Sequence, residues 1–434
     1  MSGATLEVTP TEDGRRVQVG ARMNGAGTLS IGRVGRVVAL VAAGALVLAA
    51  APAASSAAAP DTAPEGSAEQ LGSTSRGLTY PRPTELGGPG MGTDYTPVAV
   101  TDSGVVVGGA IHEGSMSAFR WRDGLTEVLT GYSWSQPWAV NEAGQVLLNV
   151  SVDNASRPFV WEVDGEAVDI LGPGRSGGAG GINDHGVAAV TIVPSGVGEV
   201  ESVATWDDGV LRTLSSPGVP SSSATGDAIN NRGEVAGSTW VDGLPRAVVW
   251  RDGAVTALEL PGGSGSIGLS INERGQVLVA LLDDRFGVWE ADGRFRELSA
   301  GFTPIELDDR GVVTGFLRSP PMTGNPVPAV AHDRGVVRLP AFSGGIGEPL
   351  GTSDRGIHVG WTGRTGDPVI RPTAWLWGLP VRLGTSLSSA EGPFSGGRAI
   401  DVNRHGLVVG YLIYDDGGYT GQQHAVLWDL RPKH

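Results

Sequence analysis

Apolar and polar positions alternate along the chain in a pattern that predicts short β-strands from about residue 95 to the C-terminus. Apolar runs of a few residues are separated by turns rich in Gly, Asn and Asp, without the three- and four-residue spacing of an amphipathic helix. The pattern is clearest in AINNRGEVAG at 228–237, RAVVWRDG at 246–253 and AVTALELPGG at 254–263. These segments predict four strands, A to D, joined by a tight turn, a loop and a second tight turn.

This unit recurs eight times, and the turn between strands A and B marks each copy. Its glycine recurs 36 to 50 residues apart, at Gly104, Gly144, Gly186, Gly233, Gly275, Gly311, Gly356 and Gly406. Three residues earlier stand Thr101, Asn141, Asn183, Asn230, Asn272, Asp308, Ser353 and Asn403. A side chain that accepts a local hydrogen bond, followed three residues later by Gly, suits a type I turn. We therefore interpret the repeated Asn as structural.

A tryptophan near the end of strand C is the second recurring feature. It is found at Trp121, Trp161, Trp206, Trp250, Trp289, Trp377 and Trp428, with His332 in the corresponding place of repeat six. A large flat side chain at one position of every unit is typical of packing between adjacent sheets, where each ring buries roughly 150 to 250 Å². We predict that these residues form the core between the sheets.

Four short strands in each unit of about 42 residues predict an all-β fold, an eight-bladed β-propeller of four-stranded antiparallel blades. The last unit ends after strand C, whereas TYPRPTELGGPG at 79–90 resembles a strand D and its Gly-rich continuation. We expect this N-terminal strand to complete the last blade, so that the ring closes without an exposed sheet edge.

The N-terminal part of the chain has a different composition. Residues 37–50 form a 14-residue apolar run after Arg33 and Arg36, followed by small residues, as in a secretory signal peptide. The alternative, a retained membrane anchor, would need roughly 20 apolar residues. We assign 1–59 to the signal region, with Met23 as a possible true start, 60–76 to a disordered linker and 77–434 to the propeller. The expected location is extracellular, with no membrane contact after cleavage.

Composition removes several kinds of chemistry. The chain has no Cys, and Lys433 is its one lysine, which excludes disulfides, thiolate nucleophiles, Cys-based metal sites and Schiff-base lysines. A formal net charge of −15 argues against a nucleic-acid partner. We expect a monomer that needs no cofactor.

Two segments carry a resemblance to a known family. VNRHGLVVG at 402–410 and HAVLW at 424–428 resemble the extracellular HAF-repeat family, named for the sequence His-Ala-Phe, and fragments such as Ala118-Phe119 and Pro158-Phe159 occur in other units. The resemblance covers residues 95–434. It implies a secreted repeat protein and brings no established activity or catalytic residues.

The loops between strands B and C vary most, and functional loops on a rigid scaffold commonly do. They are longest in repeats six to eight, where tyrosines gather beside acidic residues. Our candidate ligand-binding residues are Trp361, Arg364, Tyr411, Tyr414, Asp415, Asp416 and Tyr419. The alternative is an ordinary exposed loop whose tyrosines lie on the sheet. No metal is expected, with calcium at Asp415 and Asp416 as the alternative, because the histidines lack zinc-site spacing.

Catalytic motifs occur in the wrong structural context. The segment GRSGG at 174–178 has the spacing of a nucleophile elbow, but it lies in a Gly-rich loop instead of a strand-to-helix turn. We therefore expect no catalytic residues and a secreted, non-catalytic binding module for a glycan or a protein. The alternatives are a glycan-active hydrolase or lyase with carboxylates at the channel mouth and a structural envelope protein.

Overall fold

The computed structural model describes two separate units of the chain. The described residues are 5–10, 17–22, 81–87, 95–112, 114–193, 201–214, 224–241, 243–263, 265–318, 324–342, 345–390, 392–415 and 422–431. In the first unit, β1 (Thr5–Pro10) pairs antiparallel with β2 (Val17–Arg22). The apolar run at 37–50 and the linker at 60–76 lie outside the described residues. None of the described residues belongs to a helix that could span a membrane.

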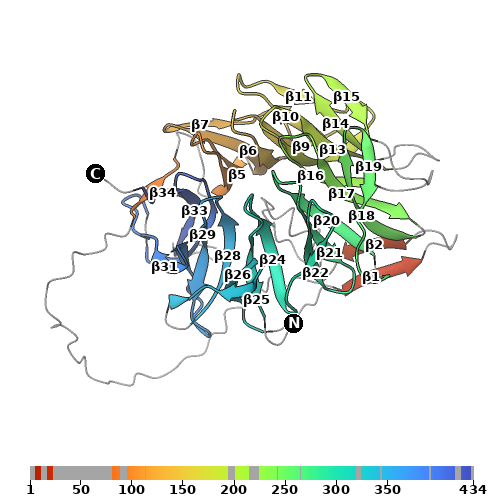
Figure 1. Cartoon of the computed structure of the whole chain (residues 1–434). Coiled ribbons are helices and arrows are strands. Elements are labelled where there is room, and N and C mark those ends of the chain that lie inside the picture. The colour runs from red at the N-terminus through yellow and green to blue at the C-terminus, as the bar shows by residue number, and fades with distance from the viewer. Residues whose placement is uncertain are drawn as a thin grey trace, which may run out of the picture. The chain divides into compact units, whose positions relative to one another are not determined.

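The second unit contains eight four-stranded antiparallel sheets, which follow one another along the chain (Figure 1). We number these blades from the N-terminus. The first four comprise β4 (Tyr95–Val100), β5 (Val106–His112), β6 (Ser115–Arg122) and β7 (Leu125–Val128); β8 (Ser135–Val140), β9 (Val146–Val152), β10 (Ala155–Trp161) and β11 (Ala167–Asp169); β12 (Ser176–Ile182), β13 (Ala188–Val193), β14 (Ser202–Asp207) and β15 (Val210–Thr213); and β16 (Ala224–Ile229), β17 (Val235–Val241), β18 (Leu244–Arg251) and β19 (Ala254–Ala257).

The remaining blades have the same strand order. They comprise β20 (Ser266–Ile271), β21 (Val277–Leu281), β22 (Phe286–Trp289) and β23 (Phe295–Glu297); β24 (Phe302–Leu307), β25 (Val313–Leu317), β26 (Val327–His332) and β27 (Gly335–Arg338); β28 (Ile346–Thr352), β29 (Ile357–Gly363), β30 (Arg371–Leu376) and β31 (Leu379–Arg382); and β32 (Phe394–Val402), β33 (Leu407–Tyr414), β34 (Gln422–Asp429) and β3 (Pro83–Glu85). The predicted eight-bladed propeller is confirmed.

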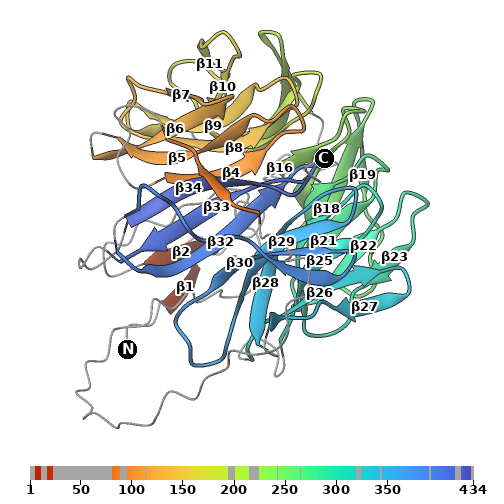
Figure 2. The same ribbon diagram turned by 90° about the vertical axis from the view of Figure 1, so that its left-hand side faces the viewer.

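The two ends of this unit meet in blade 8, as the sequence predicts. Strand β3 pairs antiparallel with β34, Glu85 lying opposite Val426, and the Leu86 N–H donates to the Ala425 carbonyl at 2.9 Å. Leu86 is 2% exposed and packs in a core shared by blades 8 and 1. These two blades lie side by side in Figure 2, where the blue β32–β34 adjoin the orange β4 and β5.

The first strand of every blade contacts the first strand of its neighbours, and each one carries a β-bulge at the same place. In four blades the residue before the bulge is proline, at Pro97, Pro137, Pro304 and Pro349. Proline has no N–H to donate, and a bulge leaves one ladder hydrogen bond unmade, so the two features suit each other. The bulge bends the innermost strands where eight of them crowd around the axis.

Tryptophans fill the interfaces between blades, with one change from the predicted register. Trp161, Trp206, Trp250, Trp289 and Trp428 are at most 6% exposed, and each packs against residues of the preceding blade. In blade 7 this place belongs to Trp375, which is fully buried, and Trp377 is 90% exposed.

The assignments of Trp377 and His332 to the core position are therefore wrong, because turn geometry shifts the register. Trp377 and Gly378 form the turn between strands C and D with φ values of 49° and 79°, as Asp123 and Gly124 do in blade 1. His332 closes the corresponding turn of blade 6 by pairing with Gly335. The residue that takes the tryptophan position of blade 6 is Ala331.

Deleting residues 81–87 should abolish the cooperative unfolding transition. The deletion removes β3 and the buried Leu86, and it leaves β34 as an open sheet edge. Urea unfolding followed by circular dichroism tests this, with an equal deletion of residues 60–66 as the control. A chain without 81–87 that unfolds like the intact protein would contradict closure by β3.

Candidate functional site

The turns and loops fall on two faces of the ring. Arg120 at the end of β6 donates to the carbonyls of Gly144, in the A to B turn of blade 2, and of Glu162, in its C to D turn, both at 3.0 Å. These two kinds of turn therefore lie on one face, which we call the tight-turn face. Because the strands are antiparallel, the B to C loops and the connections between blades lie on the other, which we call the long-loop face.

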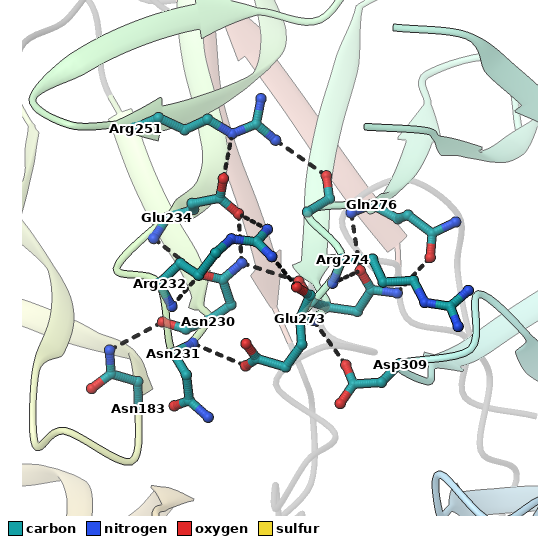
Figure 3. Close-up of polar contacts among 12 residues, drawn as sticks. Asn183, Asn230, Asn231, Arg232, Glu234, Arg251, Glu273, Arg274, Gln276 and Asp309 are labelled. Carbon is teal, nitrogen blue, oxygen red and sulfur yellow. Dashed lines mark hydrogen bonds and ion pairs between the residues drawn. The ribbon is translucent and has the colours of Figure 1, made fainter. Parts of the chain in front are cut away.

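On the tight-turn face, the repeated asparagines link five of the blades to the next, as Figure 3 shows for Asn183 and Asn230. The Asn230 Oδ1 accepts the N–H groups of Arg232 and Glu234 within its own turn, at 3.1 and 3.0 Å. Its Nδ2 donates to the Asn272 carbonyl of the next blade at 3.1 Å. The same inter-blade bond joins Asn141 to Asn183, Asn183 to Asn230, Asn272 to Asp308 and Asn403 to Thr101.

The residue after each of these positions forms a second ring. The Glu273 N–H donates to the Asp309 Oδ1 at 2.8 Å, and the Asn231 N–H donates to the Glu273 Oε1 at 2.9 Å. The same bond joins Arg404 to Asp102, Asp102 to Glu142, Glu142 to Asp184, Asp184 to Asn231, and Asp309 to Asp354. We name this set of bonds, together with the asparagine bonds, the blade clasp.

The blade clasp involves six carboxylates of the tight-turn face. Each of its six acidic side chains accepts at least one backbone N–H, and a carboxylate already bonded in this way is structural. Burial, together with the charge of Asp354, raises the pKa of Asp309 from 3.8 to about 6. Burial also raises the pKa of Glu142.

The clasp is interrupted once, between blades 7 and 8. The Ser353 side chain has no amide group to donate to the next blade. The Arg404 side chain has no oxygen that could accept the Asp354 N–H. Among the described residues, no hydrogen bond joins these two turns. The seam is held nearer the long-loop face, where the Gly397 N–H donates to the Ile370 carbonyl at 3.1 Å.

The predicted ligand-binding residues lie in different surroundings. Trp361 on β29 is 7% exposed and Tyr414 on β33 is 5% exposed, so these rings do not offer the exposed contact surface expected of them. Tyr414 packs edge-on against Phe394 and His424, with centroids 6.0 and 5.6 Å apart.

The other predicted residues are more exposed or not described. Tyr411 is half-buried on β33, and Arg364 and Asp415 are exposed. Asp416 and Tyr419 lie outside the described residues. A ligand role for this set stays a prediction.

Trp361 belongs to a charged cluster at the long-loop end of the innermost strands. Glu348 on β28 lies directly opposite Trp361 in the sheet of blade 7. Its Oε1 is 3.3 Å from Arg318 Nη2, which follows β25 of blade 6. From blade 8, the Arg398 guanidinium lies over the Trp361 ring, 5.7 Å from its centroid. We call Arg318, Glu348, Trp361 and Arg398 the mouth cluster.

Sequence reasoning missed the charged members of the mouth cluster, although a signal was present. The bulge follows Pro349 in blade 7 and Ala399 in blade 8. Glu348 and Arg398 lie one residue before these two positions. The other blades have Thr96, Gln136, Gly178, Thr225, Ile267 and Thr303 there, so blades 7 and 8 alone place charge at this level. The signal becomes readable only after the bulges fix the register.

The electrostatics of the mouth cluster favour an anion. Two guanidinium groups flank one carboxylate, and burial raises the pKa of Glu348 although Arg398 and Arg318 act to lower it. The Arg398 Nε is buried and has no hydrogen-bond partner within the described part of the chain. Unlike the carboxylates of the blade clasp, this cluster retains an unsatisfied donor.

Charge is also divided unevenly between the blades. Residues 95–301 contain 12 arginines and 26 acidic residues, whereas residues 302–434 contain 12 basic and 12 acidic residues. An anionic ligand is therefore repelled least by the sector formed by blades 6 to 8.

The histidine of the HAF-like segment has a structural explanation. His424 Nδ1 lies 2.5 Å from Glu85 Oε1, so it joins β34 to the closing strand β3. Arg157 and Asp169 form the same link between strands C and D of blade 2, and Arg285 and Glu297 form it in blade 5.

A hollow lies between the C to D turns of blades 2 and 3. It is open and is lined by Glu162, Asp164, Glu166, Asp208 and Trp206 among others. Within the described ranges, no group of three or more His, Cys, Asp or Glu side chains is placed to hold a metal ion.

Comparison with known proteins identifies the fold alone. No family model and no curated protein matches the chain. Among solved structures it is similar to a streptogramin B lyase, with 13% identity over 67% of this chain and 91% of that one and a TM-score of 0.37. It is similar to virginiamycin B lyase from Staphylococcus aureus, with 13% identity over 67% and 94% and a TM-score of 0.38. The β-propeller domain of the Trilobed protease from Pyrococcus furiosus matches at 11% identity over 82% and 95%, with a TM-score of 0.45.

Asn230→Asp should lower the free energy of unfolding by about 1 to 2 kcal/mol. The carboxylate keeps the turn bonds from Arg232 and Glu234 but loses the donor to the Asn272 carbonyl, as Asp308 illustrates in blade 6. Urea unfolding at pH 7.5 measures the effect, and Asn325→Asp, in an exposed segment, is the control. No difference from the control would contradict the inter-blade role.

Asp309→Asn should raise the free energy of unfolding at pH 7.5 by about 1 kcal/mol, a figure reduced for solvent screening. The pKa of Asp309 is about 6 in the folded protein and about 3.8 when unfolded, so the folded state binds the proton more tightly. The contribution is therefore stabilising at low pH and is lost as pH rises through 6. The amide oxygen still accepts the Glu273 N–H. Unfolding at pH 7.5 and 4.5 should show the advantage of Asn shrinking on acidification; a constant or growing advantage would contradict the assignment.

Proposed function

We propose that the chain is a secreted, non-catalytic binding module whose glycan or protein ligand enters at the mouth cluster of blades 6 to 8. The observation that carries the proposal is Arg398, a guanidinium on an innermost strand whose buried Nε lacks a partner among the described residues. A buried donor left unsatisfied costs about 1 to 3 kcal/mol, so this guanidinium has hydrogen-bonding capacity that the described residues do not use.

The scaffold supports this role. A closed ring of eight sheets gives the mouth cluster a rigid frame, and six carboxylates of the opposite face are bonded within the clasp. At the level of the mouth cluster, Glu348 is the one carboxylate on the eight innermost strands. A glycosidase site needs two carboxyl groups roughly 5 to 9.5 Å apart, and the lack of a second carboxylate at this level supports binding without turnover.

Secretion and membership of the HAF-repeat family belong to the same proposal. The apolar run at 37–50 with its preceding arginines supports export. The segments at 402–410 and 424–428 support the family, and their residues lie in blade 8, where the chain ends pair.

Binding to a panel of immobilised glycans and extracellular proteins tests the function. We expect saturable binding without turnover, weakened at least about tenfold by Arg398→Gln through loss of a charged hydrogen-bond donor. Arg294→Gln is the matched control, because that guanidinium is 80% exposed on a C to D turn of the tight-turn face. Equal binding by both variants would contradict the mouth cluster as the site, and turnover would favour the hydrolase alternative.

A further inference from the structure

We propose that the mouth cluster binds a carboxylate carried by an acidic glycan, and that Glu348 is an internal competitor for the same two arginines. This inference rests on the proposed function, since it names the ligand class of that site. It follows from how the guanidinium groups are held, from the place of Glu348 between them and from the uncharged groups at the same level of the ring.

The two arginines are oriented by aromatic rings, which leaves their donors available. Arg398 lies over Trp361, and Arg318 lies over Phe316 with 4.9 Å to the ring centroid. Stacking of this kind holds the plane of a guanidinium without using its N–H groups. A planar fork held in this way matches the two oxygens of a carboxylate.

Glu348 already supplies one carboxylate to this place. Its Oε1 is 3.3 Å from Arg318 Nη2, and its charge is coupled to that of Arg398. Its side chain is 19% exposed and that of Arg318 is 23% exposed, so a ligand can reach the arginines at the long-loop end of the innermost strands. An incoming carboxylate and Glu348 compete for them, and protonation of Glu348 removes the competitor.

The charged and titratable groups around Glu348 set the direction of the pH effect. They are Arg318 from blade 6 and Arg398 from blade 8, and the Trp361 indole faces it from its own blade. Burial raises the pKa of Glu348 above its ordinary 4.5. A sugar carboxylic acid has a pKa of about 3.5, so it stays ionised between pH 7.5 and 5. Binding should therefore tighten as pH falls from 7.5 toward 5.

Polar, uncharged groups at this level on the blades nearest the two arginines suit a sugar, whereas blades 3 to 5 carry Gly178, Thr225 and Ile267 there. Thr96, Gln136 and Thr303 occupy the matching positions on blades 1, 2 and 6, are half-buried and carry no charge. Hydroxyl and amide groups around one pair of arginines match a ligand with many hydroxyls and one carboxylate in each unit. An acidic peptide lacks these hydroxyls, so it would leave the hydroxyl and amide groups of this level unmatched.

Calorimetric titration of the full-length protein with oligogalacturonate tests the proposal, with the methyl-esterified oligomer as the uncharged control. We expect the acid to bind and the ester to bind at least about tenfold more weakly. Glu348→Gln should bind the acid more tightly at pH 7.5 and lose the pH dependence. Arg398→Gln should lose binding and Arg398→Lys should recover part of it, while circular dichroism reports whether each variant folds.

The outcomes separate the two proposals. If acid and ester bind equally and both respond to Arg398→Gln, the carboxylate inference is overturned but the binding site is retained. Weaker binding by Glu348→Gln has the same consequence. Preference for an acidic peptide over the oligomer also overturns it. Failure of the Glu348→Gln variant to bind either oligomer at pH 5 contradicts the carboxylate inference, and insensitivity of every ligand to Arg398→Gln contradicts the proposed function.

Discussion

The hydrogen bond from one turn to the next is the interaction on which this ring depends. Each repeat contacts its neighbours, and the blades that carry the core tryptophan bury it against the preceding blade. The Asn side chain satisfies its own turn through Oδ1 and fixes the neighbouring turn through Nδ2, as Asn230 does. One residue type therefore sets both the local geometry and the spacing between blades. This explains why the asparagine recurs although the loops on the opposite face vary.

The fold was predictable because the repeat supplies the same signal eight times. Turn glycines such as Gly233, with a φ of 76°, mark each A to B turn by a conformation that other residues rarely adopt. Closure was predictable from the missing last strand. Register was harder, because a type I′ turn normally carries Asp or Asn before its glycine. Trp377 takes that turn position in blade 7. We therefore mistook it for the core tryptophan, which is Trp375, two residues earlier.

The candidate site was predictable only as a sector of the ring. Loop length pointed to repeats six to eight, and Trp361 proved to be part of the mouth cluster. Its charged partners come from strands of three different blades, so no local sequence pattern joins Arg318, Glu348 and Arg398. Tyr414 is buried with its hydroxyl bonded to the Thr385 carbonyl, so this tyrosine does not offer the exposed surface that loop composition led us to expect.

Departures from the repeat are concentrated in the same sector. Blades 6 and 7 replace the clasp asparagine with Asp308 and Ser353, as blade 1 does with Thr101, and blade 6 has Ala331 in place of the tryptophan. Each change removes an inter-blade contact that other blades retain, so it is not explained by stability. Where a repeat protein gives up regular contacts, the positions concerned are commonly functional. The seam without clasp bonds lies between the two blades that contribute Glu348 and Arg398, and the stacking of Arg398 on Trp361 crosses that seam. The guanidinium that we assign to ligand binding therefore also contributes to holding the ring together where the clasp is interrupted.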